Sequence, residues 1–184
     1  MTKFLIILLA IALIICVGLL IRPSFISQKP SDYAQNLPQF DITKNLGGVM
    51  KSEGVLYGPT GKVALSFVAT MVGEWSGNVG TLKENFTYSN GTEQNREWTI
   101  TLHDNGRIAV TAPDVIGEGD GVISGNTLMI KYKLQLTKEA GGHVLDVVDW
   151  LYLMENGVVI NKSEMRKYGV KVAELVANIR PEDM

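Results

Sequence analysis

The sequence predicts an all-β fold, an up-and-down antiparallel β-barrel that follows one N-terminal transmembrane helix. Tight-turn motifs recur along the chain, namely Pro59-Thr-Gly61, Asn90-Gly91, Asp104-Asn-Gly106, Ser124-Gly-Asn126, Gly141-Gly142 and Glu155-Asn-Gly157. Between them, segments such as residues 98–102 and 128–136 alternate apolar and polar residues, which is the period of a half-buried strand. An uninterrupted apolar run over residues 4–21 precedes all of these signals.

The apolar run over residues 4–21 is long enough to cross a bilayer as a helix. It holds eighteen residues without a charge, and at about 1.5 Å per residue such a helix reaches about 27 Å. A cleaved signal peptide has a shorter apolar core followed by small residues, whereas this run continues into Arg22-Pro23. We therefore predict an uncleaved anchor. The alternative is a lipoprotein attached through Cys16, although the bulky Ile14 and Ile15 fit poorly before a lipidated cysteine.

The anchor divides the chain into three expected parts: residues 1–22 as the membrane anchor, residues 23–38 as an extended linker, and residues 39–184 as the barrel domain. Lys3 precedes the run and Arg22 and Lys29 follow it, so the flanking charges do not set its orientation. A short N-terminal tail before a signal-like segment normally stays in the cytoplasm. We therefore expect a single-pass protein of the bacterial inner membrane with its C-terminal domain in the periplasm.

Composition excludes several functions for the part of the chain after the anchor. Lys3 and Arg22 belong to residues 1–22, so the remainder carries 15 Lys and Arg against 19 Asp and Glu, a formal charge of −4. An acidic domain without a basic stripe is a poor binder of nucleic acid. The remainder contains no cysteine, which excludes disulfides and thiolate metal sites. No cofactor or metal is expected, and no protein partner is indicated.

The elements follow in order from the same signals. Residues 41–46 fit a short helix stopped by Gly47-Gly48, and nine or ten strands are expected between residues 50 and 180. Three glycines at spacing two in residues 117–121 fall on one face of a strand, which indicates a barrel wall that bends there. The last segment, residues 172–179, is ambiguous because its apolar positions also fit one face of a helix.

Candidate acid–base residues are few, and no known catalytic motif is present. His103 and His143 each lie beside a tight turn, which is typical of surface residues. Asp146 and Asp149 fall on opposite faces of one apolar strand, so at least one points toward the more buried side, where Arg96 could pair with it. Catalysis would need a second group at a defined distance, and a metal site would need both histidines to converge with these carboxylates.

Aromatic residues on apolar strand faces are the main candidates for a binding site. Trp98 and Tyr132 share their faces with aliphatic residues, and Trp150 and Tyr152 share one face of a later strand. Such residues can be plain core packing, but in a barrel of about eight or more strands they can line a cavity for one apolar ligand. We predict that these four side chains line the barrel interior, with Arg96 as the partner for a ligand carboxylate.

Several motifs together resemble a bacterial family of envelope proteins, the domain-of-unknown-function 3833 family. They run in one order over residues 32–180 and include Trp75-Ser-Gly-Asn-Val-Gly80, Arg96-Glu-Trp98, Asp149-Trp-Leu-Tyr-Leu153 and Asn161-Lys-Ser-Glu-Met-Arg-Lys-Tyr-Gly169. The resemblance implies a lipocalin-like β-barrel without an assigned activity, closed by the last segment as a strand. It also points toward lipids. Members of the family usually carry a lipoprotein signal, whereas we expect this chain to be anchored by the apolar run instead.

These observations predict a membrane-anchored periplasmic binding protein, not an enzyme, that holds a fatty acyl chain or another small apolar molecule near the inner membrane. Two alternatives stay open. One is an enzyme that acts on lipids or small apolar substrates through Asp146 or Asp149 with a histidine. The other is a structural protein of the cell envelope with a filled barrel.

Overall fold

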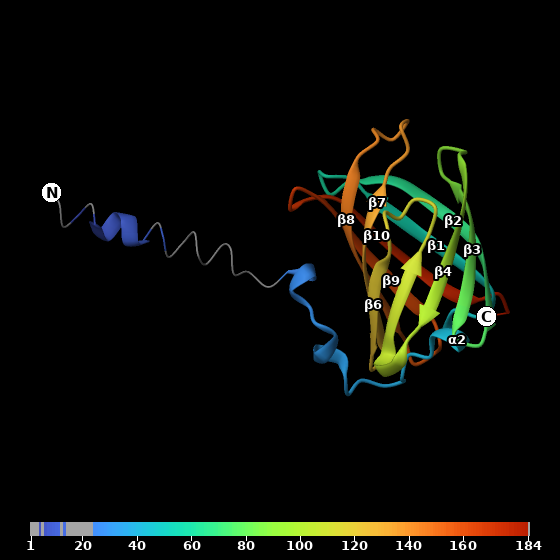
Figure 1. Cartoon of the computed structure of the whole chain (residues 1–184). Coiled ribbons are helices and arrows are strands. Elements are labelled where there is room, and N and C mark those ends of the chain that lie inside the picture. Colours follow the sequence, from blue (N-terminus) through green and yellow to red (C-terminus); the bar gives the residue numbers. More distant parts are fainter. Residues whose placement is uncertain (1–3, 5, 12, 14–23, 184) are drawn as a thin grey trace.

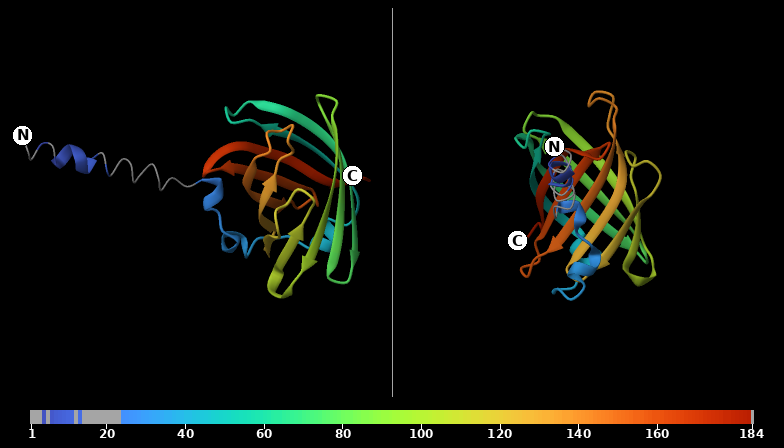
Figure 2. Two further views of the ribbon diagram at one scale, coloured as in Figure 1. Left: turned by 45° about the horizontal axis from the view of Figure 1, so that its top comes forward. Right: turned by 90° about the vertical axis from the view of Figure 1, so that its left-hand side faces the viewer.

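The protein is described by a computed structural model over residues 4, 6–11, 13 and 24–183, and its main feature is a closed β-barrel (Figures 1 and 2). Each strand pairs antiparallel with the next along the chain, and the last pairs with the first. The strands are β1 (Gly48–Tyr57), β2 (Val63–Ser76), β3 (Val79–Tyr88), β4 (Glu93–Leu102), β5 (Arg107–Thr111), β6 (Gly119–Ser124), β7 (Thr127–Gln135), β8 (Val144–Leu153), β9 (Val159–Lys167) and β10 (Val170–Pro181). The predicted up-and-down barrel is confirmed.

Alternating side chains and tight turns explain why these segments form a barrel wall. In β7, Leu128, Ile130 and Tyr132 are buried, whereas Lys131 and Lys133 on either side of Tyr132 are exposed. The interior therefore receives every second side chain, as the pleat of a strand requires. The turns connect each strand directly to the next one along the chain, which favours pairing of neighbours in sequence over longer crossovers.

The C-terminal segment is a strand, and the open choice between helix and strand is thereby settled. β10 pairs with β1 from Tyr57↔Glu174 to Met50↔Pro181, and it pairs with β9 on its other side. Without it, β1 and β9 would both present unpaired backbone groups at a sheet edge. Tertiary pairing thus decides between two patterns that fit the local sequence equally well.

The glycines of β6 lie against bulky side chains of β5. A Cβ atom on Gly121 would lie 2.5 Å from Cγ1 of Ile108, and one on Gly119 would lie 2.7 Å from Cγ2 of Val110. Both distances are much shorter than a van der Waals contact, so glycine is required for this close approach. Gly117 precedes the strand in a left-handed conformation, so only two of the three glycines share the strand face.

A short helix and its flanking residues close one end of the barrel. The predicted helix is present as α2 (Ile42–Asn45), and the side chain of Asp41 caps it by accepting hydrogen bonds from the backbone N–H of Thr43 and of Lys44. Phe40, Ile42 and Leu46 are buried in the main core, which fills this half of the barrel. The hairpin loops at the other end leave Phe86, Tyr88 and Leu175 partly exposed.

The segment between the anchor and the barrel is docked on the barrel wall, which corrects the prediction of a purely extended linker. It forms two short 3-10 turns, η1 (Phe25–Ser27) and η2 (Pro30–Tyr33), and runs along the outside of the barrel (Figure 2). The ring of Tyr33 packs 5.3 Å from that of Trp150 and 5.8 Å from that of Tyr152. The ring of Tyr33 thus covers Trp150 and Tyr152 on the outer face of β8.

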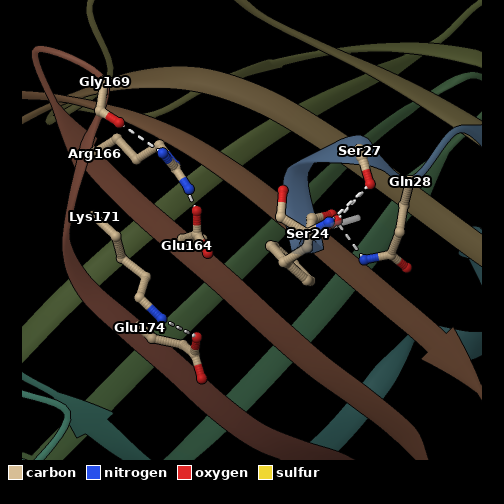
Figure 3. A network of polar contacts seen from close by, with 9 residues as sticks. Ser24, Ser27, Gln28, Glu164, Arg166, Gly169, Lys171 and Glu174 are labelled. Carbon is tan, nitrogen blue, oxygen red and sulfur yellow. Dashed lines mark hydrogen bonds and ion pairs between the residues drawn. The ribbon is translucent and has the colours of Figure 1, made fainter. Parts of the chain in front are cut away.

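Charged side chains on the neighbouring strands β9 and β10 form ion pairs on the same outer wall (Figure 3). Arg166 pairs with Glu164 and donates a hydrogen bond of 2.6 Å to the carbonyl of Gly169, while Lys171 pairs with Glu174 at 3.1 Å. Lys171 is half exposed, so we assign its pair with Glu174 a small part in stability, whereas Glu164 is buried and needs Arg166 as its partner.

The predicted anchor is only partly described. Phe4, residues 6–11 and residue 13 are helical and exposed, whereas the remainder of residues 1–22, including Cys16, lies outside the described residues. Among the residues that are described, none of the helices has the length and apolar character needed to cross a membrane.

Candidate functional site

The barrel encloses a cavity of about 130 Å³ that is lined by residues from most of its strands. Its walls are mainly aliphatic and aromatic, with Leu82, Ile100, Leu128 and Ile130 among the lining residues. A small set of polar side chains also faces it: Ser52, Glu84, Arg96, Tyr132, Asp149, Asn161 and Ser163. An apolar pocket with a few convergent polar groups is the usual form of a small-molecule site.

Strand register brings the polar residues to one level of the barrel. Glu84 on β3 is directly opposite Arg96 on β4, and Asp149 on β8 is directly opposite Ser163 on β9. Leu82 and Phe86, which lie two positions before and two positions after Glu84 on β3, also face the cavity. The polar level therefore lies between an apolar layer near α2 and an apolar layer near the opposite end.

Arg96 is held by aromatic rings and by a carboxylate. Its guanidinium carbon lies 3.9 Å from the ring centroid of Trp98 and 5.8 Å from that of Tyr132. Its Nε donates a hydrogen bond of 3.0 Å to Oδ1 of Asp114, and its Nη2 lies 2.9 Å from the same oxygen without the alignment of a hydrogen bond. Burial alone would lower the pKa of Arg96, but Tyr132, Asp114 and Glu84 together raise it.

Glu84 is a buried carboxyl group at the centre of this level, with 8% of its surface exposed. The indole Nε1 of Trp98 donates a hydrogen bond of 3.1 Å to its Oε2. Burial raises the pKa of Glu84 from 4.5 to about 7, while Arg96 and the Trp98 hydrogen bond oppose the rise and the charges of Asp149 and Asp114 add to it. The group therefore changes its protonation near neutral pH.

Asp149 lies deep in the barrel on the opposite wall, with part of its surface open to the cavity. Its Oδ1 accepts a hydrogen bond of 2.7 Å from Oγ of Ser163 and another from Nδ2 of Asn161. Burial raises the pKa of Asp149 more than these two hydrogen bonds lower it. Burial, followed by the charge of Asp149, also raises the pKa of Tyr132.

Three of the five predicted site residues line the cavity and two do not. Arg96, Trp98 and Tyr132 face the interior. Trp150 and Tyr152 point outward, because Asp149 takes the inward position of β8 and side chains alternate along a strand. Their predicted place in the interior was wrong. These aromatic side chains lie on the outer face of β8 because the docked N-terminal segment covers them there through Tyr33.

The residues of the predicted catalytic alternative are not brought together. Asp146 lies on the outer face and pairs with Lys133 at 2.6 Å, whereas Asp149 is inside. His103 is exposed, and the exposed His143 lies with Nδ1 2.8 Å from Nζ of Lys167. Neither histidine lines the cavity. Across the described residues, no group of three or more His, Cys, Asp or Glu side chains is arranged to hold a metal ion.

The sequence prediction missed five polar residues of the site: Ser52, Glu84, Asp114, Asn161 and Ser163. A signal for Glu84 was present, since it stands between Leu82 and Phe86 on the apolar face of a strand. No comparable signal marks Asp114, because it reaches Arg96 from the loop between β5 and β6.

Comparisons with known proteins place the chain in one family and one fold. A family model described as "Protein of unknown function (DUF3833)" matches residues 19–181. A search of curated proteins finds no match. Among solved structures, Rv2717c from M. tuberculosis is 12% identical with a TM-score of 0.56, over 80% of this chain and 99% of its own. The S-type phycobiliprotein lyase CPES from Guillardia theta is 5% identical with a TM-score of 0.60, over 87% and 98%. At such low identity these two structures show a shared barrel fold.

Proposed function

The chain belongs to the family of proteins of unknown function DUF3833, and from that premise we propose that it is a membrane-anchored, lipocalin-like protein that binds a small apolar molecule inside its barrel. The observation that carries this proposal is the cavity of about 130 Å³ with apolar walls and buried polar groups at one level. A purely structural barrel has no need of a buried carboxylate and arginine facing an interior space, because such groups are costly to bury.

The size of the cavity limits the ligand. An apolar cavity of about 150 Å³ in another protein stays dry and binds benzene. The cavity of this barrel is similar, so a ring or a short stretch of an acyl chain fits the conformation described. A molecule with a longer acyl chain would have to extend past Phe86 and Leu175, at the end opposite α2.

The proposed location rests on the apolar run and on the docked segment. Residues 4–21 carry no charge and suit a helix in the inner membrane, with the barrel in the periplasm. The segment that begins with Ser24 lies against the barrel wall. The Nζ of Lys162 on β9 lies 5.2 Å from the centroid of the Phe25 ring. A short connection of this kind would keep the barrel near the lipids of that bilayer.

Native mass spectrometry of the full chain, isolated from its membranes in lipid nanodiscs, tests the proposal. We expect a co-purified small molecule bound at one per chain. Leu175→Phe adds bulk at the partly exposed edge of the cavity and should reduce its occupancy several-fold, whereas Val170→Phe, on an exposed position of the same strand, should not. A bare mass in every preparation, with no binding of added apolar molecules, would refute the proposal.

One observation favours a second candidate function, proton transfer to a bound molecule. Glu84 combines burial, a place on the cavity wall and a pKa of about 7, which suits a general acid or base at neutral pH. If the protein converts a ligand, turnover should depend on pH around 7 and disappear in Glu84→Gln. Asp146→Asn, on the outer face, should retain it.

A further inference from the structure

We propose that the molecule held in the cavity carries a polar end that donates hydrogen bonds and has no negative charge, such as a hydroxyl, amide or amine. Carboxylate-headed molecules, including free fatty acids, are then the wrong class of ligand. This inference rests on the proposed binding function and deepens it. It also departs from the sequence-based expectation that Arg96 would receive a ligand carboxylate.

The charges around the cavity disfavour a ligand carboxylate. Two carboxyl groups, Glu84 and Asp149, line it together with a single cationic side chain, Arg96. That cation is already neutralised from behind by Asp114, through a hydrogen bond of 3.0 Å and an ion-pair contact of 2.9 Å. A ligand carboxylate at this level would lie near the carboxyl groups of Glu84 and Asp149, and the one nearby cation, Arg96, is already paired with the carboxylate of Asp114.

The cavity wall offers carboxyl oxygens that can accept hydrogen bonds from a ligand. Within the part of the chain that is described, the hydrogen bonds to Asp149 end on Oδ1 and the hydrogen bond to Glu84 ends on Oε2. Oδ2 of Asp149 and Oε1 of Glu84 therefore stay available to a donor. Both residues lie on the cavity wall, and Glu84 is more than nine-tenths buried, so water meets these oxygens only inside the cavity.

The guanidinium of Arg96 is already in contact with other side chains of the protein. Its guanidinium plane is covered by Trp98 at 3.9 Å, and its Nε is occupied by Asp114. Nη2 is a buried nitrogen without an aligned acceptor. Placed near two carboxyl oxygens that lack a donor, Nη2 suits a hydroxyl or amide, which can accept from Nη2 while donating to Glu84 or Asp149. Because Oδ1 of Asp114 lies 2.9 Å from the same Nη2, a ligand carboxylate bound there would lie close to another carboxylate.

The register sets how such a molecule would lie. Its polar end would face the level of Glu84, Arg96 and Asp149, and its apolar part would lie toward Phe86 and Leu175 at the end opposite α2. The α2 half of the cavity is walled by packed core residues such as Leu82 and Ile100.

The test compares three probes of one size on the full chain in lipid nanodiscs: benzyl alcohol, benzylamine and benzoate. Isothermal titration calorimetry near pH 8, with empty nanodiscs as the blank, gives each affinity. We expect the alcohol and the amine to bind about tenfold more tightly than benzoate. In the variant carrying Glu84→Gln and Asp149→Asn, this difference should fall to less than about twofold. The matched control Asp146→Asn alters a carboxylate on the outer face of β8, the strand that also carries Asp149, and should keep the difference in affinity.

Each outcome decides the question. Benzoate binding as tightly as the other probes, or more tightly, would overturn the inference while leaving the binding function intact. A preference that persists in the double variant would also overturn it, because the preference would then arise elsewhere. If none of the probes binds, the proposed function fails together with the inference. Near-ultraviolet circular dichroism reports whether the double variant is folded, and if it is not, the three probes on the unaltered chain decide alone.

Discussion

Trp98 and Glu84 lie on adjacent strands of the barrel, and the indole Nε1 donates a hydrogen bond of 3.1 Å to Oε2 of the carboxyl group. The same tryptophan presents its ring face to the guanidinium of Arg96, 3.9 Å away. The side chain of Trp98 thus orients both the carboxyl group of Glu84 and the guanidinium of Arg96. The orientation of the candidate site depends on an aromatic residue as much as on charge pairing.

The pH dependence of stability follows from Glu84. Its pKa is about 7 in the folded barrel against an ordinary 4.5, so the folded state binds the proton more tightly than the unfolded state does. The stability this provides is fully present below pH 4.5 and is lost as the pH rises through 7. A difference of this size corresponds to about 3 kcal/mol.

We therefore expect Glu84→Gln to flatten the fall in unfolding free energy between pH 4.5 and 7 and to stabilise the protein above that range. Asp149, whose pKa is also raised by burial, should leave a residual slope of the same sign. Denaturant unfolding followed by tryptophan fluorescence measures both effects. Glu97→Gln, on the exposed face of β4, is the matched control. A slope unchanged in Glu84→Gln would contradict the assignment.

Removing Arg96 should destabilise the barrel strongly. Arg96→Met keeps an apolar stem but leaves Asp114 without its cation. It also removes the positive charge that partly offsets the cost of burying Glu84. Breaking a fully buried pair costs about 3 to 5 kcal/mol, and because the side chains of Arg96 and Asp114 are 15% and 26% exposed we expect a smaller loss, about 2 kcal/mol. The exposed pair of Arg107 and Asp120 provides the contrast, since Arg107→Met should cost at most about 1 kcal/mol. Equal losses in the two variants would show that the interior pair is not special.

Truncating Trp150 should release the docked N-terminal segment. The side chain is fully buried and contacts the ring of Tyr33 at 5.3 Å, so Trp150→Ala should cost about 3 to 5 kcal/mol and expose residues 24–36 to proteases. Limited proteolysis with N-terminal sequencing of the fragments detects the release. Tyr168→Ala, at an aromatic that is 91% exposed, should leave the digestion pattern unchanged. Ligand affinity should change little in either variant, because Trp150 lies outside the cavity.

Adding a methyl group to the wall at Gly121 should disrupt the contact between β5 and β6. The new Cβ would lie 2.5 Å from Cγ1 of Ile108, so Gly121→Ala should cost about 1 to 3 kcal/mol. Gly58→Ala is the control, because its new Cβ would meet only ordinary contacts near 3.9 Å. Thermal unfolding compares the two. A neutral Gly121→Ala would mean that the wall can give way at this point.

The fold was predictable because its causes are local. Turn motifs such as Asn90-Gly91 and the alternation along β7 determine strands and hairpins within a few residues of themselves. The identity of the last segment needed more, since residues 172–179 satisfy two periodicities. Its pairing with β1, which begins more than 100 residues earlier, is invisible to any local pattern.

The candidate site was only partly predictable, because inward and outward faces are relative to what covers them. Trp150 looked like an interior residue since it is aromatic and stands in an apolar strand, yet Tyr33 buries it on the outside. The alternation along the strand placed Asp146 and Asp149 on opposite faces without showing which one points inward, and the structure places Asp149 inside. The contact between Arg96 and Asp114 joins a strand to a loop, and no spacing in the sequence signals it.

A crystal structure of the protein soaked with 4-bromobenzyl alcohol, with bromine located by anomalous scattering, tests directly whether the barrel holds a small molecule at its polar level. We expect one bromine peak inside the barrel, toward Phe86 and Leu175, with the hydroxyl within hydrogen-bond distance of Glu84 or Asp149. A barrel interior filled by side chains, or bromine found only on the outer surface, would contradict it.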